Sequence, residues 1–233
     1  MRAVILAGGL GTRLRPYTTV IPKPLVPVGG RPVLEHIIWS LHRHGVYRVE
    51  LCVSHLGNLI RLYLTQATLP DDLELDFHWE DEPLGTAGAL RTVPDLAGTF
   101  IAMNGDILTS LNYSALIRHH EEVGAALTIA TQRKTVDIDL GVIESSNGRV
   151  TGYVEKPTLD YAVSMGIYVY DARALEHLPD GPCQFPELVL RLLAAGETVA
   201  TFPSDAEWYD IGTLEEYERA SQDFESAPEK FES

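Results

Sequence analysis

The sequence is poor in cysteine and has no long apolar run. Its two cysteines, Cys52 and Cys183, lie far apart and form no C-x-x-C pair, which argues against a zinc site and against a disulfide framework. We expect both thiols to be buried. No apolar run approaches the roughly 20 residues that span a bilayer, and the opening "RAVIL" leads into glycines rather than into a signal-peptide pattern. These absences predict a cytoplasmic protein without a membrane partner.

Acidic residues are absent from the first 34 positions, although the whole chain carries a net charge of −15. That net charge disfavours general binding to nucleic acid or to an anionic membrane, because those partners need a basic face. The acid-free stretch instead holds five basic residues, which are Arg2, Arg13, Arg15, Lys23 and Arg31. This asymmetry predicts that an anion binds there.

Strand and helix patterns alternate through the first half of the chain. Short apolar runs predict strands at residues 2–6, 46–54, 99–103 and 125–131, and an alternating pattern predicts a half-exposed strand at 73–79. Helical spacing of apolar residues predicts helices at residues 33–44, 56–64 and 113–123. This alternation is typical of an α/β protein, in which ligands bind at the carboxyl ends of the strands.

The pattern changes after residue 135. The segments "LGVIE", "GRVTGYVE" and "VSMGIYVYD" predict strands separated by turns such as Asn147-Gly148, which indicates antiparallel pairing. Helices are predicted at about 185–195 and 213–224, and the tail at 226–233 is expected to be frayed. A chain of 233 residues suits one sizeable core, so we expect a single domain over residues 1–225.

The loop "LAGGLGTRLRP" at residues 6–16 follows the first predicted strand. Glycines there would let backbone N–H groups approach phosphate oxygens, and the two arginines would add charged donors. The loop is not a P-loop, because no Gly-Lys-Ser/Thr closes it. It is not a dinucleotide fingerprint either, since Leu14 stands where the third glycine would be. A nucleotide phosphate loop and an ordinary glycine turn both remain open on these residues alone.

Further motifs follow in order along almost the whole chain. They are "PKPLVPVGGRPVLEH" at 22–36, "EPLGTAGAL" at 82–90, "NGD" at 104–106, "EKP" at 155–157, "GIYVY" at 166–170 and "WYDIGT" at 208–213. With the glycine loop, this set closely resembles the sugar-1-phosphate nucleotidyltransferases, also called nucleoside-diphosphate-sugar pyrophosphorylases. The phrase "EPLGTAGAL" looks most like guanylyltransferases for mannose-1-phosphate or heptose-1-phosphate.

The resemblance implies a fold and a reaction. The fold would be a Rossmann-like, three-layer α/β/α core of the GT-A type, with a mixed sheet and a small antiparallel sugar-binding extension. Residues 1–135 would mainly bind nucleotide and residues 136–212 mainly sugar phosphate. The reaction would be Mg²⁺-dependent and would convert an NTP and a sugar-1-phosphate into an NDP-sugar and pyrophosphate.

The same resemblance assigns the nucleotide site. Arg13 would hold the β- and γ-phosphates, and Lys23 would bridge phosphates at the reacting centre, so both count with Asp106 as catalytic candidates. Arg15 and Arg31 are equally well explained as surface charges. The remaining nucleotide-binding candidates are Leu6, Ala7, Gly8, Gly9, Gly11, Thr12, Glu80, Pro83, Gly85, Thr86, Gly88, Asn104 and Gly105.

Two carboxylates are implied as metal ligands, Asp106 and Asp210. Hard oxygen ligands suit Mg²⁺, which usually takes one or two carboxylates together with phosphate oxygens and water. Taken without the other motifs, Asp106 would be a turn residue and Asp210 a cap of the last helix.

The sugar side of the site is implied for four residues. Glu155 would grip sugar hydroxyls, Lys156 would hold the sugar phosphate, and Gly141 and Gly166 would let the backbone approach the ring. Glycine within a strand is itself a sign of close approach. The sequence departs from many family members by having Ser164-Met165 before Gly166, so the hydroxyl pattern of the sugar is left open.

Selection of the base is expected in the loop "EDEPLGTAG". Guanine offers N1–H and N2–H₂ donors, which Glu80 or Glu82 could accept, whereas thymine and uracil offer no matching pair of donors. GTP is therefore the expected nucleotide. An acidic, exposed loop without such a role is the alternative.

Two other functional classes were weighed. A catalytically silent NDP-sugar-binding subunit could lose Arg13, Lys23, Asp106 and Asp210, yet all four are present. A dinucleotide-dependent oxidoreductase conflicts with the missing third glycine. UTP, dTTP, CTP and ATP remain alternative nucleotides, cytidylyl transfer to an alcohol phosphate remains open, and a homodimer is one expected assembly. We expect no C-terminal β-helix of hexapeptide repeats.

Overall fold

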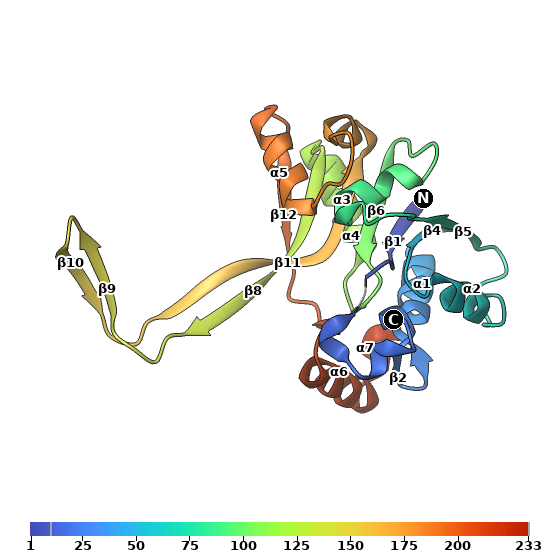
Figure 1. The fold of residues 1–233 in the computed structure, drawn as a ribbon, viewed down its shortest axis with the longest axis horizontal. Helices are drawn as coiled ribbons and strands as arrows, with labels where there is room; N and C mark the ends of the chain where they lie inside the picture. The colour runs from blue at the N-terminus through green and yellow to red at the C-terminus, as the bar shows by residue number, and fades with distance from the viewer. Residues whose placement is uncertain (10, 233) are drawn as a thin grey trace.

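The computed structural model describes residues 1–9 and 11–232, and it is built around one seven-stranded sheet (Figure 1). The strand order is β12-β8-β11-β6-β1-β4-β5. All neighbours pair in parallel except β11, which is antiparallel to both β6 and β8. The bounds are β1 Arg2–Leu6, β4 Arg48–Val53, β5 Glu74–Trp79, β6 Thr99–Asn104, β8 Leu127–Asp137, β11 Thr158–Asp171 and β12 Val199–Pro203.

Helices cover both faces of this sheet. One core contains Ile5 of β1 and side chains of α1 (Val33–Arg43), α2 (Gly57–Leu64), α4 (Tyr113–Val123) and α6 (Leu214–Ser226). The opposite core contains Val4 of β1 and side chains of α3 (Gly85–Gly88), η4 (Ala89–Thr92) and α5 (Phe185–Ala194). Successive residues of a strand point to opposite faces, so the buried "RAVIL" run contributes to both cores. The predicted three-layer α/β/α class with a mixed sheet is thereby confirmed.

Short elements complete the body. Two small antiparallel sheets pair β2 (Pro27–Val28) with β3 (Arg31–Pro32) and β7 (Ile107–Thr109) with β13 (Trp208–Asp210). The 3₁₀ turns η1 (Thr12–Leu14), η2 (Tyr17–Thr19) and η3 (Lys23–Leu25) carry the chain from β1 to β2, and η5 (Ala172–His177) follows β11. Among the described residues, no helix is long and apolar enough to cross a membrane.

A two-stranded ribbon projects from the body (Figure 1). Its strands are the outer parts of β8 and β11, which pair from Thr131 opposite Ser164 out to Asp137 opposite Thr158. Beyond them, β9 (Val142–Ser146) and β10 (Arg149–Val154) form an antiparallel hairpin at the tip. We call residues 132–163 the arm. The antiparallel strands were predicted, but their projection away from the body was not.

The tail differs from its prediction. Instead of fraying, residues 229–232 form α7 (Glu229–Glu232), which lies beside α1 and α6 (Figure 1). Phe231 is 4% exposed, and its ring lies 5.5 Å from that of Phe224 between centroids. Its carbonyl oxygen accepts a hydrogen bond from Arg43 at 2.8 Å. Burial of this one aromatic ring holds an otherwise polar tail in place.

Candidate active site

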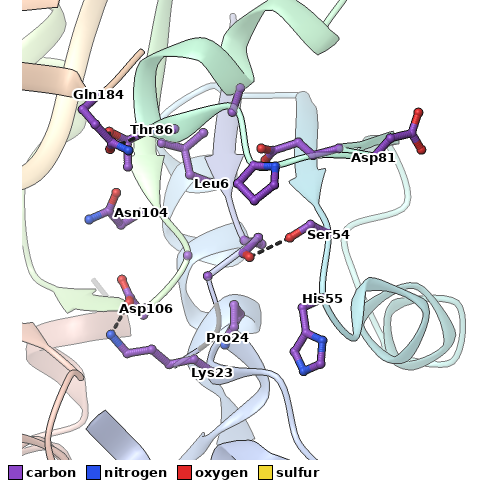
Figure 2. A pocket seen from close by; sticks show the side chains of 18 residues that line it. Leu6, Lys23, Pro24, Ser54, His55, Asp81, Thr86, Asn104, Asp106 and Gln184 are labelled. Atoms are coloured by element: carbon purple, nitrogen blue, oxygen red, sulfur yellow. Dashed lines mark hydrogen bonds and ion pairs between the residues drawn. The ribbon is translucent and has the colours of Figure 1, made fainter. Parts of the chain in front are cut away.

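A cavity of about 730 Å³ lies where four parallel strands end (Figure 2). The segments that line it follow the carboxyl ends of β1, β4, β5 and β6. The chain leaves β1 toward β4 on one side, while β6 pairs on its other side. In open α/β sheets such a switch point is the usual place for a ligand.

The glycine loop forms one wall of the cavity. Ser54, just after β4, donates a hydrogen bond to the carbonyl oxygen of Gly8 at 2.7 Å (Figure 2). A Cβ atom at Gly8 would lie 2.9 Å from the Ser54 hydroxyl and 3.2 Å from a Glu80 carboxylate oxygen. Only glycine fits this position without displacing those side chains. At Gly9 a Cβ atom would meet nothing within 4 Å.

The turn after β6 forms the floor. Gly105 donates its N–H to the carbonyl oxygen of Leu6 at 2.9 Å, which holds the ends of β1 and β6 together. A Cβ atom at Gly105 would lie 3.2 Å from that same oxygen. The chain therefore passes close beneath the glycine loop. Asn104 and Asp106 flank Gly105 and both line the cavity (Figure 2).

The loop from residue 80 to residue 88 forms the opposite rim. Glu80 accepts a hydrogen bond from the N–H of Leu84 at 3.1 Å, and the chain then turns at Gly85, whose φ is +77°. Glu80, Asp81, Pro83, Gly85 and Thr86 line the cavity, whereas Glu82 is exposed outside it. The structure thus separates the two carboxylates that sequence reasoning could not distinguish.

A charged cluster lies at one end of the cavity. Lys23 forms an ion pair with Asp106 (Figure 2). Its ammonium nitrogen is 3.4 Å from a carboxylate oxygen of Asp210. The pairing of β7 with β13 places Asp210 opposite Ile107, and Ile211 donates its N–H to the carbonyl oxygen of Asp106 at 3.0 Å. Burial raises the pKa of Asp106, although the neighbouring Lys23 ammonium opposes that rise.

These two carboxylates fit a divalent cation. Oδ1 of Asp106 is buried and has no hydrogen-bond partner among the described residues, and Oδ2 faces a positive charge. A buried, unpaired carboxylate oxygen is costly unless a ligand satisfies it. No cluster of three or more His, Cys, Asp or Glu side chains suited to a metal occurs in the described chain. Mg²⁺ needs only one or two carboxylates when phosphates complete its shell.

The capping alternative for Asp210 is wrong. The last long helix, α6, begins after Thr213, whose hydroxyl accepts the N–H of Glu216. Asp210 instead ends β13 and is oriented toward Lys23. Asp106 does occupy the turn between β6 and β7, as the alternative interpretation of a turn residue predicted. Its side chain nevertheless belongs to the charged cluster.

Most of the predicted nucleotide residues come together here, but four do not line the cavity. Gly11 has φ +59° and packs against Thr18, which donates to its carbonyl oxygen at 2.6 Å. Thr12 and Arg13 are exposed in η1, and the Arg13 guanidinium lies against Gly212. Gly88 donates its N–H to the carbonyl oxygen of Cys183 at 3.0 Å, so it joins α3 to the segment before α5. Gly11 and Gly88 therefore support the cavity walls without lining the cavity.

The predicted sugar residues are divided. Gly166 does not line the cavity itself but lies beside Asn104, which does: a Cβ atom at Gly166 would be 2.8 Å from the side-chain nitrogen of Asn104. Glu155 and Lys156 follow β10 and Gly141 precedes β9, so all three are in the arm. There Glu155 accepts a hydrogen bond from Tyr153 at 2.8 Å, and the Tyr153 ring covers Gly141. None of these three lines the cavity of its own chain.

Comparison with known proteins decides the family. The nucleotidyl transferase family model matches residues 2–227. The chain belongs to that family. The suspected resemblance to sugar-1-phosphate nucleotidyltransferases is thereby confirmed.

Named relatives within the nucleotidyl transferase family differ in nucleotide. UTP--glucose-1-phosphate uridylyltransferase of Synechocystis sp. is 31% identical over 245 residues, with 94% of this chain aligned to 62% of that protein. Mannose-1-phosphate guanyltransferase beta-B of Xenopus laevis is 28% identical, with 93% aligned to 62%. The chain thus spans about 62% of the length of these curated relatives.

Solved structures agree with the fold over nearly the full chain. The crystal structure of HddC from Yersinia pseudotuberculosis has a TM-score of 0.76 and 31% identity, covering 96% of this chain and 99% of that one. A second structure of HddC, complexed with GMP-PN, has a TM-score of 0.75 and 30% identity.

Sequence reasoning missed several residues that line the cavity of this nucleotidyl transferase. Ser54 and His55 follow β4, where the carboxyl end of a parallel strand was a usable signal. Gln184 reaches the cavity from the segment before α5, and its amide oxygen is 3.4 Å from the Thr86 hydroxyl. No local pattern marks that contact. The other lining residues outside the prediction are Pro24, Asp81 and Ala89.

Proposed function

We propose that this protein transfers a nucleotidyl group from GTP to a sugar-1-phosphate, releasing pyrophosphate and forming a GDP-sugar. The observation that carries this proposal is the Lys23, Asp106 and Asp210 cluster at the end of a cavity walled by the glycine loop. An oxygen of the sugar phosphate attacks the α-phosphorus of GTP. The bond from that phosphorus to the β-phosphate oxygen breaks, and pyrophosphate leaves.

Two anionic substrates must meet in this reaction, so placement and charge matter more than proton transfer. The glycine loop presents an open side at Gly9, where triphosphate oxygens can approach the backbone. Lys23 is the one fixed cation among the described lining residues, and it lies beside the floor of the cavity. It would hold phosphate oxygens once a bound cation relieves its pairing with Asp106. Arg13 would reach the leaving phosphates from the rim.

Asp106 and Asp210 would hold the Mg²⁺ ion. When bound, Mg²⁺ would supply positive charge to the phosphate oxygens of the transition state. The unpaired Oδ1 of Asp106 supports this assignment. The magnesium dependence of the reaction is part of the proposal.

The choice of GTP rests on Glu80. Its side chain lines the cavity at the rim, close to Gly8, where a base could meet a carboxylate acceptor. Guanine carries two adjacent donors on its Watson–Crick edge, and uracil does not. Relatives named for guanylyl transfer and a relative structure with GMP-PN support the choice. A relative named for uridylyl transfer keeps UTP as the competing nucleotide.

A matrix of substrates tests the proposal. Five NTPs are each combined with several sugar-1-phosphates and Mg²⁺, and pyrophosphate release is measured. We expect the highest kcat/KM with GTP and one sugar phosphate. Higher kcat/KM with UTP would reject the base assignment alone. No release with any pair would reject nucleotidyl transfer and favour a silent nucleotide-sugar-binding subunit.

A further inference from the structure

The arm carries three predicted sugar-site residues, Gly141, Glu155 and Lys156, none of which lines the cavity that they should complete. We propose that two copies of this chain exchange arms, so that Lys156 of each copy completes the sugar-phosphate site of the other. This inference rests on the proposed function for the role of Lys156. Its geometry rests on the arm itself.

The arm has little contact with its own body. Gln132 at its base donates a hydrogen bond to the carbonyl oxygen of Ala206 in the body at 2.9 Å. Hydrogen bonds found for residues 133–163 in the described chain all have their partners within the arm, such as Arg133 with Asp160 and Thr158 with Asp137. A two-stranded ribbon alone is marginally stable in water. An arm of this length therefore needs a surface to cover it.

Apolar side chains of the arm support this need. Tyr153 is 60% exposed and Leu140 is 73% exposed. Ile143 lies opposite Tyr153 in the β9–β10 pair, so these two exposed side chains share one face of the hairpin. Exposed apolar side chains grouped in this way favour an interface between proteins. The full set comprises Val136, Leu140, Ile143, Val150, Tyr153, Val154 and Tyr161.

The position of the arm on the sheet matches the position of the cavity. β8 runs parallel to β12 and antiparallel to β11, which is itself antiparallel to β6, so the carboxyl end of β8 points the same way as those of β1 and β6. The arm therefore leaves the body at the edge of the sheet that carries the cavity. The six residue steps from Thr131 to Asp137 carry it about 20 Å outward.

The cavity lacks what the arm carries. Its described charged lining consists of Glu80, Asp81 and Asp106 against a single fixed cation, Lys23. Lys23, Arg13 and the proposed Mg²⁺ ion are all assigned to the reacting phosphates of the nucleotide, so no further fixed cation among the described lining residues is left for the sugar phosphate. Lys156, in the connection between β10 and β11 of the arm, is exposed and is held at φ +46°, a strained conformation that is often found at functional sites.

A second copy of this chain would both cover the arm and complete the cavity. Each chain offers one arm and one incomplete cavity, and a two-fold axis would join both pairs in one closed dimer. Folding the arm back onto its own cavity would instead require a sharp bend where the β11–β8 register shifts, between Ser164 and Tyr168, because the ladder beyond that point pairs regularly out to Asp137.

Subunit complementation tests the exchange. Lys156→Ala and Asp106→Asn chains with different affinity tags are coexpressed, and the mixed dimer is purified through both tags. Each homodimer should lose at least about 100-fold of wild-type activity. In the mixed dimer the intact cavity of the Lys156→Ala chain receives an intact arm, so one site of two works and activity returns to about half of wild type.

The other outcomes separate the claims. An inactive mixed dimer, or failure to recover any mixed dimer because the protein is monomeric, overturns arm exchange while leaving nucleotidyl transfer in place. A fully active Lys156→Ala homodimer overturns the role of Lys156, and the exchange argued from it.

A cross-link tests the geometry without activity. The double variant Asp81→Cys, Lys156→Cys is treated with a short bis-maleimide, because Cys52 and Cys183 are buried and protected. Arm exchange predicts a covalent dimer on a denaturing gel. A species of monomer mass with an internal link, or no link at all, overturns it. A covalent dimer of this variant, together with a wild-type protein that shows no transferase activity, would preserve arm exchange and reject the proposed function.

Discussion

The ammonium group of Lys23 forms an ion pair with the carboxylate of Asp106, although 83 positions separate the two residues in the sequence. The turn η3 brings Lys23 beneath the glycine loop, and the end of β6 brings Asp106 to the same point. The pairing of β7 with β13 then adds Asp210. Three distant motifs therefore meet as one charged centre, and the proposed reaction depends on it.

Replacing Asp106 by Asn should abolish turnover and leave the fold intact. The amide cannot balance the charge of a cation, so we expect kcat to fall by at least about 100-fold. Burial already disfavours the charged carboxylate, so the thermal midpoint should change little. Asp76→Asn is the matched control, since Asp76 on β5 pairs with Arg48 of β4 and does not line the cavity. Full activity in Asp106→Asn would remove Asp106 from the mechanism.

Replacing Glu80 by Gln should weaken the preference for GTP. The neutral amide is a poorer acceptor for two guanine donors, so we expect kcat/KM for GTP to fall by about 10-fold or more relative to UTP. Glu82→Gln is the control, because Glu82 lies outside the cavity. Equal effects of the two substitutions on the GTP to UTP ratio would contradict the base assignment.

Replacing Gly85 by Ala should destabilise the rim loop. The new Cβ atom would lie 2.6 Å from the carbonyl oxygen of Cys183, and φ at Gly85 is +77°. Gly98→Ala shares the positive φ, +64°, but its Cβ atom enters open space. In urea unfolding we expect a loss of about 1–2 kcal/mol for Gly98→Ala and at least about 1 kcal/mol more for Gly85→Ala. Similar losses would show that the Cys183 contact is unimportant.

His120 should make the unfolding free energy depend on pH. Burial lowers its pKa below the ordinary 6.5, although Asp171 opposes that shift. The unfolded chain therefore binds a proton before the folded chain does, and stability falls as pH drops below about 6.5 toward the folded pKa. The slope fades above pH 6.5 and is nearly gone by about pH 7.5, where the unfolded chain no longer binds the proton.

The substitution His120→Asn isolates that effect. Asn keeps an acceptor or donor near Thr128, which lies 2.9 Å from His120 Nδ1, but it does not titrate. Urea unfolding between pH 7.5 and pH 5 should show a shallower loss of stability in the variant. Parallel curves for the two proteins would assign the slope to other groups.

Replacing Phe231 by Ala should destabilise the whole fold, because this ring is buried between the tail and the body. Large-to-small changes at such positions cost about 3 kcal/mol or more. Leu190→Ala on α5 is the control, since Leu190 is 67% exposed and should cost less than about 0.5 kcal/mol. If the Phe231→Ala protein were as stable as the control, the tail would be frayed in solution, as the sequence predicted.

Local patterns predicted most of the fold. The apolar run of β1 and the helical spacing of apolar residues in α4 follow from burial against neighbouring layers of the fold. The bounds of both elements could therefore be predicted to within a residue or two. The tail was misread because one buried ring, Phe231, outweighs the polar residues around it. No local pattern reports such a long-range contact.

The site was predicted less completely than the fold. Motif order identified Lys23, Asp106 and Asp210 as one group, and the structure brings them together. Ser54 and Gln184 were missed because ordinary polar residues carry no motif. The separation of Lys156 from the cavity of the same chain could not be predicted either. Alternating side chains predict strand pairing but not the direction in which a ribbon leaves the sheet.

The fate of labelled phosphate tests the central claim most directly. GTP labelled at the α-phosphorus and GTP labelled at the γ-phosphorus are each incubated with the preferred sugar-1-phosphate and Mg²⁺, and the products are separated. The account predicts the α-label in the GDP-sugar and the γ-label in pyrophosphate, in equal molar amounts. Label transfer from the γ-position to the sugar, or no transfer of either label, would contradict it.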